Sequence, residues 1–170
     1  MERNTGARGM HPELESIFRT HYPYVVSVAC RVLRFDADAE DVAQEVFVSF
    51  ARSAVPAADA RAWLTVAATH AALNVLRSRR RRDAREVSVA EPQESADAAA
   101  QVIELVEQQR VRTALANLPR KQAVVLVLRY SGLSYAEIAE TTQLSPSSVG
   151  TTLRRAEAAL RKELSHDPSV

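Results

Sequence analysis

The stretch from Leu133 to Leu164 limits the fold of this chain most, because it contains two helix starts separated by one short turn. Ser134 is followed three residues later by Glu137, which is the spacing of a capping box, so a short helix is predicted from about residue 135 to residue 142. Ser145 is placed to cap a second helix directly afterwards. Two capped helices joined by so short a turn are typical of a helix-turn-helix.

The second helix of this stretch has one apolar face and one polar face. Pro146 occupies its first position, where the missing N–H group costs nothing. The apolar positions recur at helical spacing: Val149, Leu153, Ala156, Leu160 and Leu164. The opposite face of the first turns carries Ser147, Ser148, Gly150, Thr151, Arg154 and Arg155. Hydroxyl groups reach base edges or phosphates, and guanidinium groups bind guanine or backbone oxygens, so the pattern favours DNA binding over a helical hairpin with a solvated face.

The composition predicts an all-α protein. With 170 residues, 46% of them apolar, the chain is long enough for one domain or two small ones, and its seven Pro and four Gly are few. The net charge of +1 argues against nonspecific coating of nucleic acid. The lone Cys30 excludes an internal disulfide and a cysteine-based zinc site, and we expect no metal and no cofactor. Neither a signal peptide nor a membrane-spanning apolar run is visible, which predicts a soluble, cytoplasmic protein.

The N-terminal half is predicted to form three helices after a disordered segment at residues 1–11. The first runs from Glu13 to about Leu33, with Pro23 as its only kink position. The second begins with acidic residues, which the helix dipole favours in a first turn. Its outer face carries Asp38, Asp41, Gln44, Glu45 and Ser49. Taken alone, this face reads as a solvated helix surface.

The third helix, residues 60–82, is unusual because it ends in the sequence RSRRRR. One stripe of this helix carries Trp63, Ala67, His70, Asn74 and Arg77. Cations stabilise the C-terminus of a helix, but five arginines between residues 77 and 82 exceed that need. The combination instead favours phosphate contacts together with stacking on unpaired bases.

Residues 83–106 are acidic and are predicted to be a flexible linker that becomes helical from about Asp97. That helix is expected to end near Asn117, and Pro119 opens the next one. The Val-rich run at residues 120–130 could be a buried strand, but a helix is preferred because no second strand is available to pair with it. Because the linker has little apolar surface, the units at 12–82 and 107–165 are expected to fold separately.

Four segments in this order and spacing resemble the extracytoplasmic-function (ECF) sigma factors, a subfamily of the bacterial sigma-70 family. They read HYPYVV, DAEDVAQEVF, RAWLTVAATHAALNVLRSRRRR and LPRKQAVVLVLRYSGLSYAEIAE, and the resemblance that they mark out extends over most of the chain. The resemblance implies a region 2 helical bundle joined by the linker to a region 4 helix-turn-helix. It also implies a stress- or signal-responsive sigma factor that directs core RNA polymerase to promoters and assists DNA melting.

The resemblance further implies partners and site residues. Binding to the clamp of the largest polymerase subunit is expected at Asp38, Asp41, Gln44 and Glu45. Recognition of the minus-ten element is expected at Arg61, Trp63, His70, Asn74, Arg77, Arg79, Arg80 and Arg81. Recognition of the minus-thirty-five element is expected at Ser145, Ser147, Ser148, Thr151, Thr152, Arg154 and Arg155. The C-terminal unit would also touch the flap of the second-largest subunit, and members of the family commonly have an anti-sigma factor.

The sequence departs from the family pattern at four positions. Val66 and His70 stand where Arg and Asn are usual, which affects the strength or base preference of minus-ten recognition. Gly150 and Thr152 replace a common Lys and Arg, so affinity at the minus-thirty-five element should depend on the arginines that follow. The alternative of a free-standing helix-turn-helix transcriptional regulator leaves the arginine run and DAEDVAQEVF unexplained. An enzyme is not expected, because no catalytic constellation is present.

Overall fold

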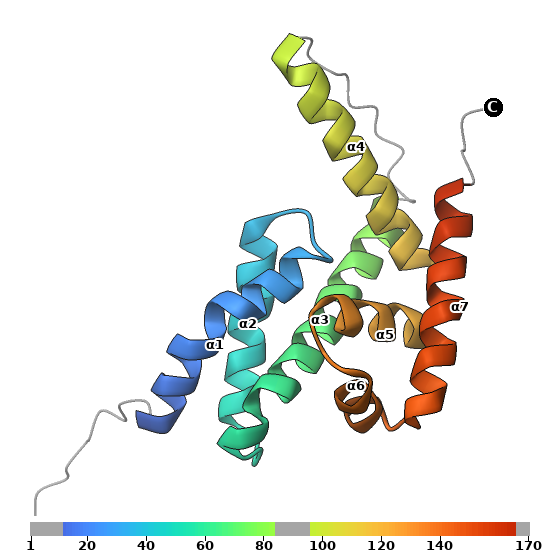
Figure 1. Ribbon diagram of the computed structural model, residues 1–170. Coiled ribbons are helices and arrows are strands. Elements are labelled where there is room, and N and C mark those ends of the chain that lie inside the picture. The colour runs from blue at the N-terminus through green and yellow to red at the C-terminus, as the bar shows by residue number, and fades with distance from the viewer. Residues whose placement is uncertain (1–11, 84–95, 166–170) are drawn as a thin grey trace, which may run out of the picture.

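The computed structural model describes residues 12–83 and 96–165, and every element in these ranges is a helix, which confirms the predicted all-α class. The elements are α1 (Pro12–Cys30), α2 (Asp36–Ala51), the 3-10 helix η1 (Ala57–Asp59), α3 (Ala60–Asp83), α4 (Ala96–Asn117), α5 (Arg120–Tyr130), α6 (Tyr135–Thr142) and α7 (Pro146–Ser165) (Figure 1). The expected disorder of residues 1–11 and the flexible part of the acidic linker, residues 84–95, lie outside the described residues.

Helices α1, α2 and α3 form a bundle whose interior is apolar and aromatic. The rings of Phe18, Tyr22 and Phe47 meet there, with centroids 4.7 to 5.9 Å apart. Helix α1 ends three residues earlier than the apolar pattern predicts. The reason is that Val32 and Leu33 turn into the core, and their N–H groups bond back to the carbonyl of Ala29 at 3.0 and 2.9 Å. The apolar periodicity therefore continues beyond the helix that it predicts.

Helices α4 to α7 form a second group, and α5 lies at its centre. Six consecutive residues, 123 to 128, are buried, because α5 packs against α3, α6 and α7. A helix covered on several sides needs apolar residues all round, and this is why its sequence resembles a buried strand. The preference for a helix over residues 120–130 is confirmed.

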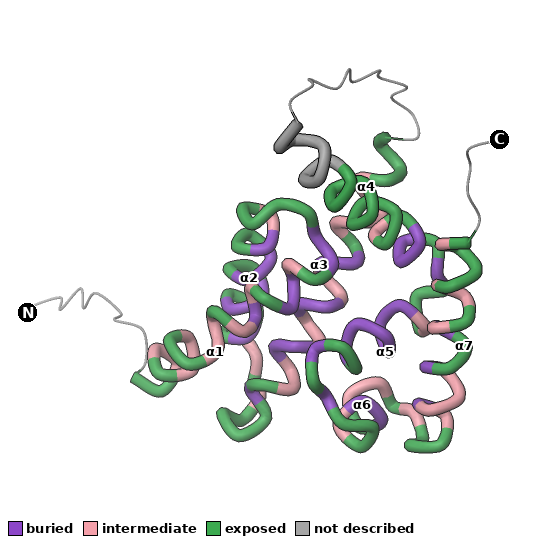
Figure 2. Tube along the Cα trace, turned by 45° about the horizontal axis from the view of Figure 1, so that its top comes forward, coloured by how far each residue is buried: buried purple, intermediate pink, exposed green. Residues whose placement is uncertain are grey.

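The two groups of helices pack on each other along α3. Figure 1 shows α3 running between α1 and α2 on one side and α5 and α6 on the other, and in Figure 2 buried segments of α3 and α5 lie together at the centre. Buried residues of both groups belong to one contiguous hydrophobic cluster. Separate folding of the two units stays a prediction, but in this arrangement they share a core.

Candidate nucleic-acid and polymerase interfaces

Local capping bonds build the helix-turn-helix of α6 and α7. The Ser134 hydroxyl accepts a bond from the Glu137 N–H at 3.2 Å, and the Glu137 carboxylate accepts one from the Ser134 N–H at 2.7 Å. The Ser134 N–H and then the Ser134 side chain bond to the charged carboxylate and lower the pKa of Glu137. Gln143 ends α6 in the left-handed region with φ of 56°, and the Ser145 hydroxyl accepts the Ser148 N–H at 3.2 Å to begin α7. The predicted motif and its caps are confirmed.

Helix α7 separates an apolar face from a hydroxyl-rich tip. Val149, Leu153 and Ala156 are buried, whereas Leu160 and Leu164 are only half-buried. The residues predicted to contact the minus-thirty-five element stay at least partly accessible: Ser145, Ser147, Ser148, Thr151, Thr152, Arg154 and Arg155. The hydroxyl of Ser145 lies 3.0 Å from that of Ser147 and 2.7 Å from that of Ser148. A cluster of adaptable donors and acceptors therefore sits where a recognition helix meets bases.

The acidic face of α2 keeps three of its four predicted residues exposed. Asp41, Gln44 and Glu45 lie on the outer surface, opposite the buried positions of the helix. Asp38 differs, because its side chain is half-buried and forms a salt bridge with Arg79 of α3. The second carboxylate oxygen of Asp38 is buried without a partner among the described residues. Asp38 therefore joins α2 to the arginine run of the same molecule.

The predicted minus-ten stripe of α3 faces the second group of helices. The Asn74 side-chain oxygen accepts a bond from Arg120 of α5 at 3.2 Å, and Arg77 donates to the Leu118 carbonyl at 2.9 Å. His70 is half-buried on the same side. Burial and then the Arg120 guanidinium lower the pKa of His70 below its usual 6.5. Much of this stripe is therefore occupied by contacts within the chain.

Other residues of the predicted minus-ten set have different surroundings. Trp63 is half-buried against Phe50 of α2, with ring centroids 5.6 Å apart, so it packs on the core. Arg61 is exposed, and its guanidinium lies 5.0 Å from the ring of Tyr24. Arg80 and Arg81 are exposed at the end of α3. The arginine run thus divides between intramolecular contacts and solvent.

Sequence reasoning missed a further hydrogen bond between the two groups of helices. The Tyr24 hydroxyl donates to the carbonyl of Ser131 at 2.9 Å and accepts a longer bond from Thr65 at 3.3 Å. These partners are 107 residues apart for the first bond, and no periodicity or motif relates them. Only the packing of α5 against α3 brings them together.

An apolar groove of about 610 Å³ between α4, α5 and α7 was also not anticipated. Its lining includes Val111, Leu115, Tyr130, Leu160 and Leu164, and the Tyr130 side chain is largely exposed. The half-buried leucines at the end of α7 form one wall of this groove. Accessible apolar residues gathered in a concave site are suited to receiving a partner helix.

The described ranges contain no group of three or more His, Cys, Asp or Glu side chains able to hold a metal ion. Within the same ranges, no helix has the length and apolarity needed to cross a bilayer.

Comparisons with known proteins agree with this fold. The model of Sigma-70 region 2 matches residues 17–82, and that of Sigma-70, region 4 matches residues 108–160. RNA polymerase sigma factor YlaC of Bacillus subtilis (strain 168) is 30% identical over 158 residues, which are 89% of this chain and 91% of YlaC. The fold is similar to that of CnrH, solved in complex with the cytosolic domain of CnrY, with a TM-score of 0.59 and 22% identity over 91% of this chain and 88% of that one. The chain therefore belongs to the ECF subfamily of sigma-70 RNA polymerase sigma factors.

Proposed function

We propose that this sigma factor divides its contacts among four surfaces: the outer face of α2 for the polymerase clamp, α3 for the minus-ten element, the tip of α7 for the minus-thirty-five element and the groove of α4, α5 and α7 for the flap. The observation that carries the proposal is the polarity of α7. Its apolar stripe is buried while its hydroxyls and arginines remain accessible, as a reading helix requires. The protein acts by binding, as a non-catalytic initiation factor in the cytoplasm.

The clamp assignment is supported by the exposure of Asp41, Gln44 and Glu45. These side chains form no hydrogen bond or salt bridge with other described residues, so binding a partner does not require them to break one. Asp38 would join them only by exchanging Arg79 for a group of the polymerase. We therefore assign Asp38 a weaker part in docking than its neighbours.

The minus-ten assignment requires a change of arrangement. His70 and Arg77 are half-buried toward α5 and the end of α4, so DNA reaches them fully once the second group of helices moves away. Asn74 is exposed, and DNA would replace its bond from Arg120. An unpaired base could then stack and accept hydrogen bonds on this face, while Arg80 and Arg81 hold phosphates. Trp63 would support the helix from below, because it packs on Phe50.

The minus-thirty-five assignment divides labour along α7. Ser147, Ser148 and Thr151 lie nearest the tip, where side chains reach base edges. Arg154 and Arg155 are exposed one turn farther along, where they hold backbone phosphates. Sequence preference should therefore follow the hydroxyl residues, and overall affinity should follow the arginines.

The flap assignment rests on the apolar groove, since an amphipathic helix binds in such a groove by its apolar face. We also propose an anti-sigma factor as a regulator. Helix α4 supports this, because Ile103, Leu105 and Val106 are exposed on its surface and could be covered by a partner. The complex of CnrH with the cytosolic domain of CnrY gives further support, because it shows a protein of this fold bound to another protein.

Charge reversal on α2 tests the proposed function. Asp41→Lys combined with Glu45→Lys should abolish co-purification with core polymerase and the run-off transcript from a cognate promoter. The melting temperature should stay near that of the wild type, because both side chains are exposed and unpaired in the described structure. Glu13→Lys combined with Glu104→Lys is the charge-matched control, since both residues are exposed on other helices. Normal transcription by the α2 variant would refute the clamp assignment.

A further inference from the structure

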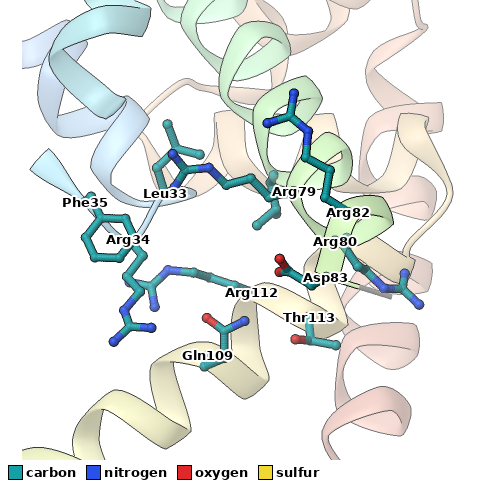
Figure 3. A pocket seen from close by; sticks show the side chains of 12 residues that line it. Leu33, Arg34, Phe35, Arg79, Arg80, Arg82, Asp83, Gln109, Arg112 and Thr113 are labelled. Carbon is teal, nitrogen blue, oxygen red and sulfur yellow. The ribbon is translucent and has the colours of Figure 1, made fainter. Parts of the chain in front are cut away.

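A cavity of about 600 Å³ lies between the turn after α1, the C-terminal end of α3 and the second half of α4 (Figure 3). This volume is in the range of small-molecule sites. Asp83 is its only acidic lining residue. Five arginines line it: Arg34, Arg79, Arg80, Arg82 and Arg112. The walls come from three segments that are distant in the sequence, so the cavity exists only while the two groups of helices are packed together.

The positive charge of this cavity is poorly compensated by the described residues. Of its arginines, only Arg79 forms a salt bridge, with Asp38. Asp83 opposes one further charge, which leaves an excess of three positive charges around one space. Like charges at this density repel, and an anion that entered the cavity would remove the repulsion.

Arg112 shows the missing partner most clearly. One of its terminal nitrogens is buried and has no acceptor among the described residues, while the other donates to Gln108 at 3.2 Å. Burial and then the nearby Arg34 guanidinium lower the pKa of Arg112. Buried donors are nearly always paired in folded proteins, so this nitrogen indicates an acceptor that the described residues do not supply.

An exposed aromatic ring stands beside these cations. Phe35 is 52% exposed, and its ring centroid lies 5.1 Å from the Arg34 guanidinium carbon and 5.7 Å from that of Arg79. Figure 3 shows Phe35 beside Arg34, with Asp83 on the opposite side of the cavity. An accessible ring flanked by guanidinium groups is suited to stacking with a nucleobase whose phosphates bind the cations.

We propose that this cavity binds a nucleoside polyphosphate, with its phosphate chain on Arg34 and Arg112, neither of which forms a salt bridge with the described residues, and its base on Phe35. A phosphate chain concentrates several negative charges at one end of a small molecule, as the cluster requires. Duplex DNA presents its phosphates on a convex surface, which fits a cavity with walls from three segments less well. Because Arg112 lies on α4, whereas Arg34 and Phe35 lie in the turn between α1 and α2, the ligand would also hold the two groups of helices together.

The test is calorimetric titration of the full chain with GTP, sodium tripolyphosphate and guanosine at near-physiological salt. GTP should bind one to one, tripolyphosphate about tenfold more weakly because the stacking contribution is missing, and guanosine not measurably. Arg34→Ala combined with Arg112→Ala should weaken GTP binding at least about tenfold, since charge-assisted bonds are lost. Phe35→Ala should weaken binding of GTP and leave that of tripolyphosphate unchanged.

The matched control is Arg19→Ala combined with Arg52→Ala, which removes the same charge from exposed sites outside the cavity. Equal loss of GTP binding in the control would show nonspecific attraction and overturn the proposal, as would wild-type affinity in the cavity variants. A nonpromoter duplex provides a further arm. The proposal is also overturned if the cavity variant binds the duplex more weakly than the wild type does but binds GTP and tripolyphosphate equally well. In that case the cations contact nucleic-acid backbone instead. If circular dichroism shows that the double variant does not fold, Arg34→Ala is tested alone, because the Arg34 side chain is exposed. This single variant must also bind GTP more weakly than the wild type.

Discussion

Tyr24 connects the first group of helices to the second through a single hydroxyl group, which donates to the Ser131 carbonyl. We call the state in which the two groups of helices pack on each other the closed arrangement. Tyr24→Phe should lower the free energy that stabilises this arrangement by about 1 kcal/mol, the typical net value of one hydrogen bond. If that arrangement covers the minus-ten face, its weakening should raise the affinity of the isolated protein for a single-stranded minus-ten oligonucleotide about fivefold. Fluorescence anisotropy with a labelled oligonucleotide measures this change.

Tyr22→Phe is the control for that variant. The Tyr22 ring packs against Phe18 and Phe47 inside the first bundle, and its hydroxyl makes no hydrogen bond to the described residues. Its removal should therefore leave the dissociation constant unchanged. Equal effects of the two substitutions, or none from either, would mean that the Tyr24–Ser131 bond does not limit access to α3.

His70 gives the closed arrangement a pH dependence. Burial and Arg120 lower its folded-state pKa below the usual 6.5, so the unfolded chain binds the proton more readily. Stability should therefore be lost as the pH falls through the interval from 6.5 down to the folded-state pKa of His70. His70→Gln should reduce this loss, measured by urea unfolding from about pH 7.5 to about pH 5. Some dependence of stability on pH should remain in the variant, because burial and Arg61 also lower the pKa of His21. An unchanged slope in the variant would contradict this role of His70.

At the scale of elements, the sequence predicts helices whose ends are defined by local chemistry. Ser134 with Glu137, and Ser145 with Pro146, define the starts of α6 and α7, because each cap bonds only to backbone a few residues away. The end of α1 is not defined by local chemistry in this way, since Val32 and Leu33 follow the helical period but turn into the core. Periodicity reports burial, and burial does not require that the helix continue.

The contacts between elements could not be predicted in the same way. Asp38 was assigned to an exposed face from its position on α2, but its partner Arg79 lies 41 residues away on α3. Asn74 and Arg120 are likewise joined only by the packing of α3 on α5. The sequence therefore indicates which residues share a helix face, whereas what covers that face depends on long-range packing.

The capping box of α6 offers a test at this scale. Ser134→Ala should destabilise the protein by about 1 kcal/mol, because the Glu137 N–H loses its acceptor at the helix start. Ser16→Ala, on the exposed side of α1, is the control and should change stability little. Urea unfolding of both variants measures the difference. A Ser134 variant as stable as the control would show that tertiary packing alone holds α6 in place.

At the scale of the whole molecule, the closed arrangement and the low net charge both lower the affinity of the isolated protein for promoter DNA. The net charge of +1 gives little general attraction to DNA, and part of the proposed minus-ten face, including His70 and Arg77, lies against α5 and the end of α4. Core polymerase would bind α2 and the apolar groove at fixed positions, which separates the two groups of helices and exposes α3. The isolated sigma factor should therefore bind its promoter poorly.

Permanganate reactivity of the thymines in the minus-ten element tests this central claim most directly. The promoter is identified by sequencing transcripts after overexpression, and the footprint is taken with the isolated protein, with core polymerase and with both. The thymines should become reactive only when both are present, because opening a duplex requires several kcal/mol that a small protein with a partly covered binding face does not supply. Reactive thymines with the isolated protein alone would contradict the account, since they would show that α3 reads the promoter without polymerase.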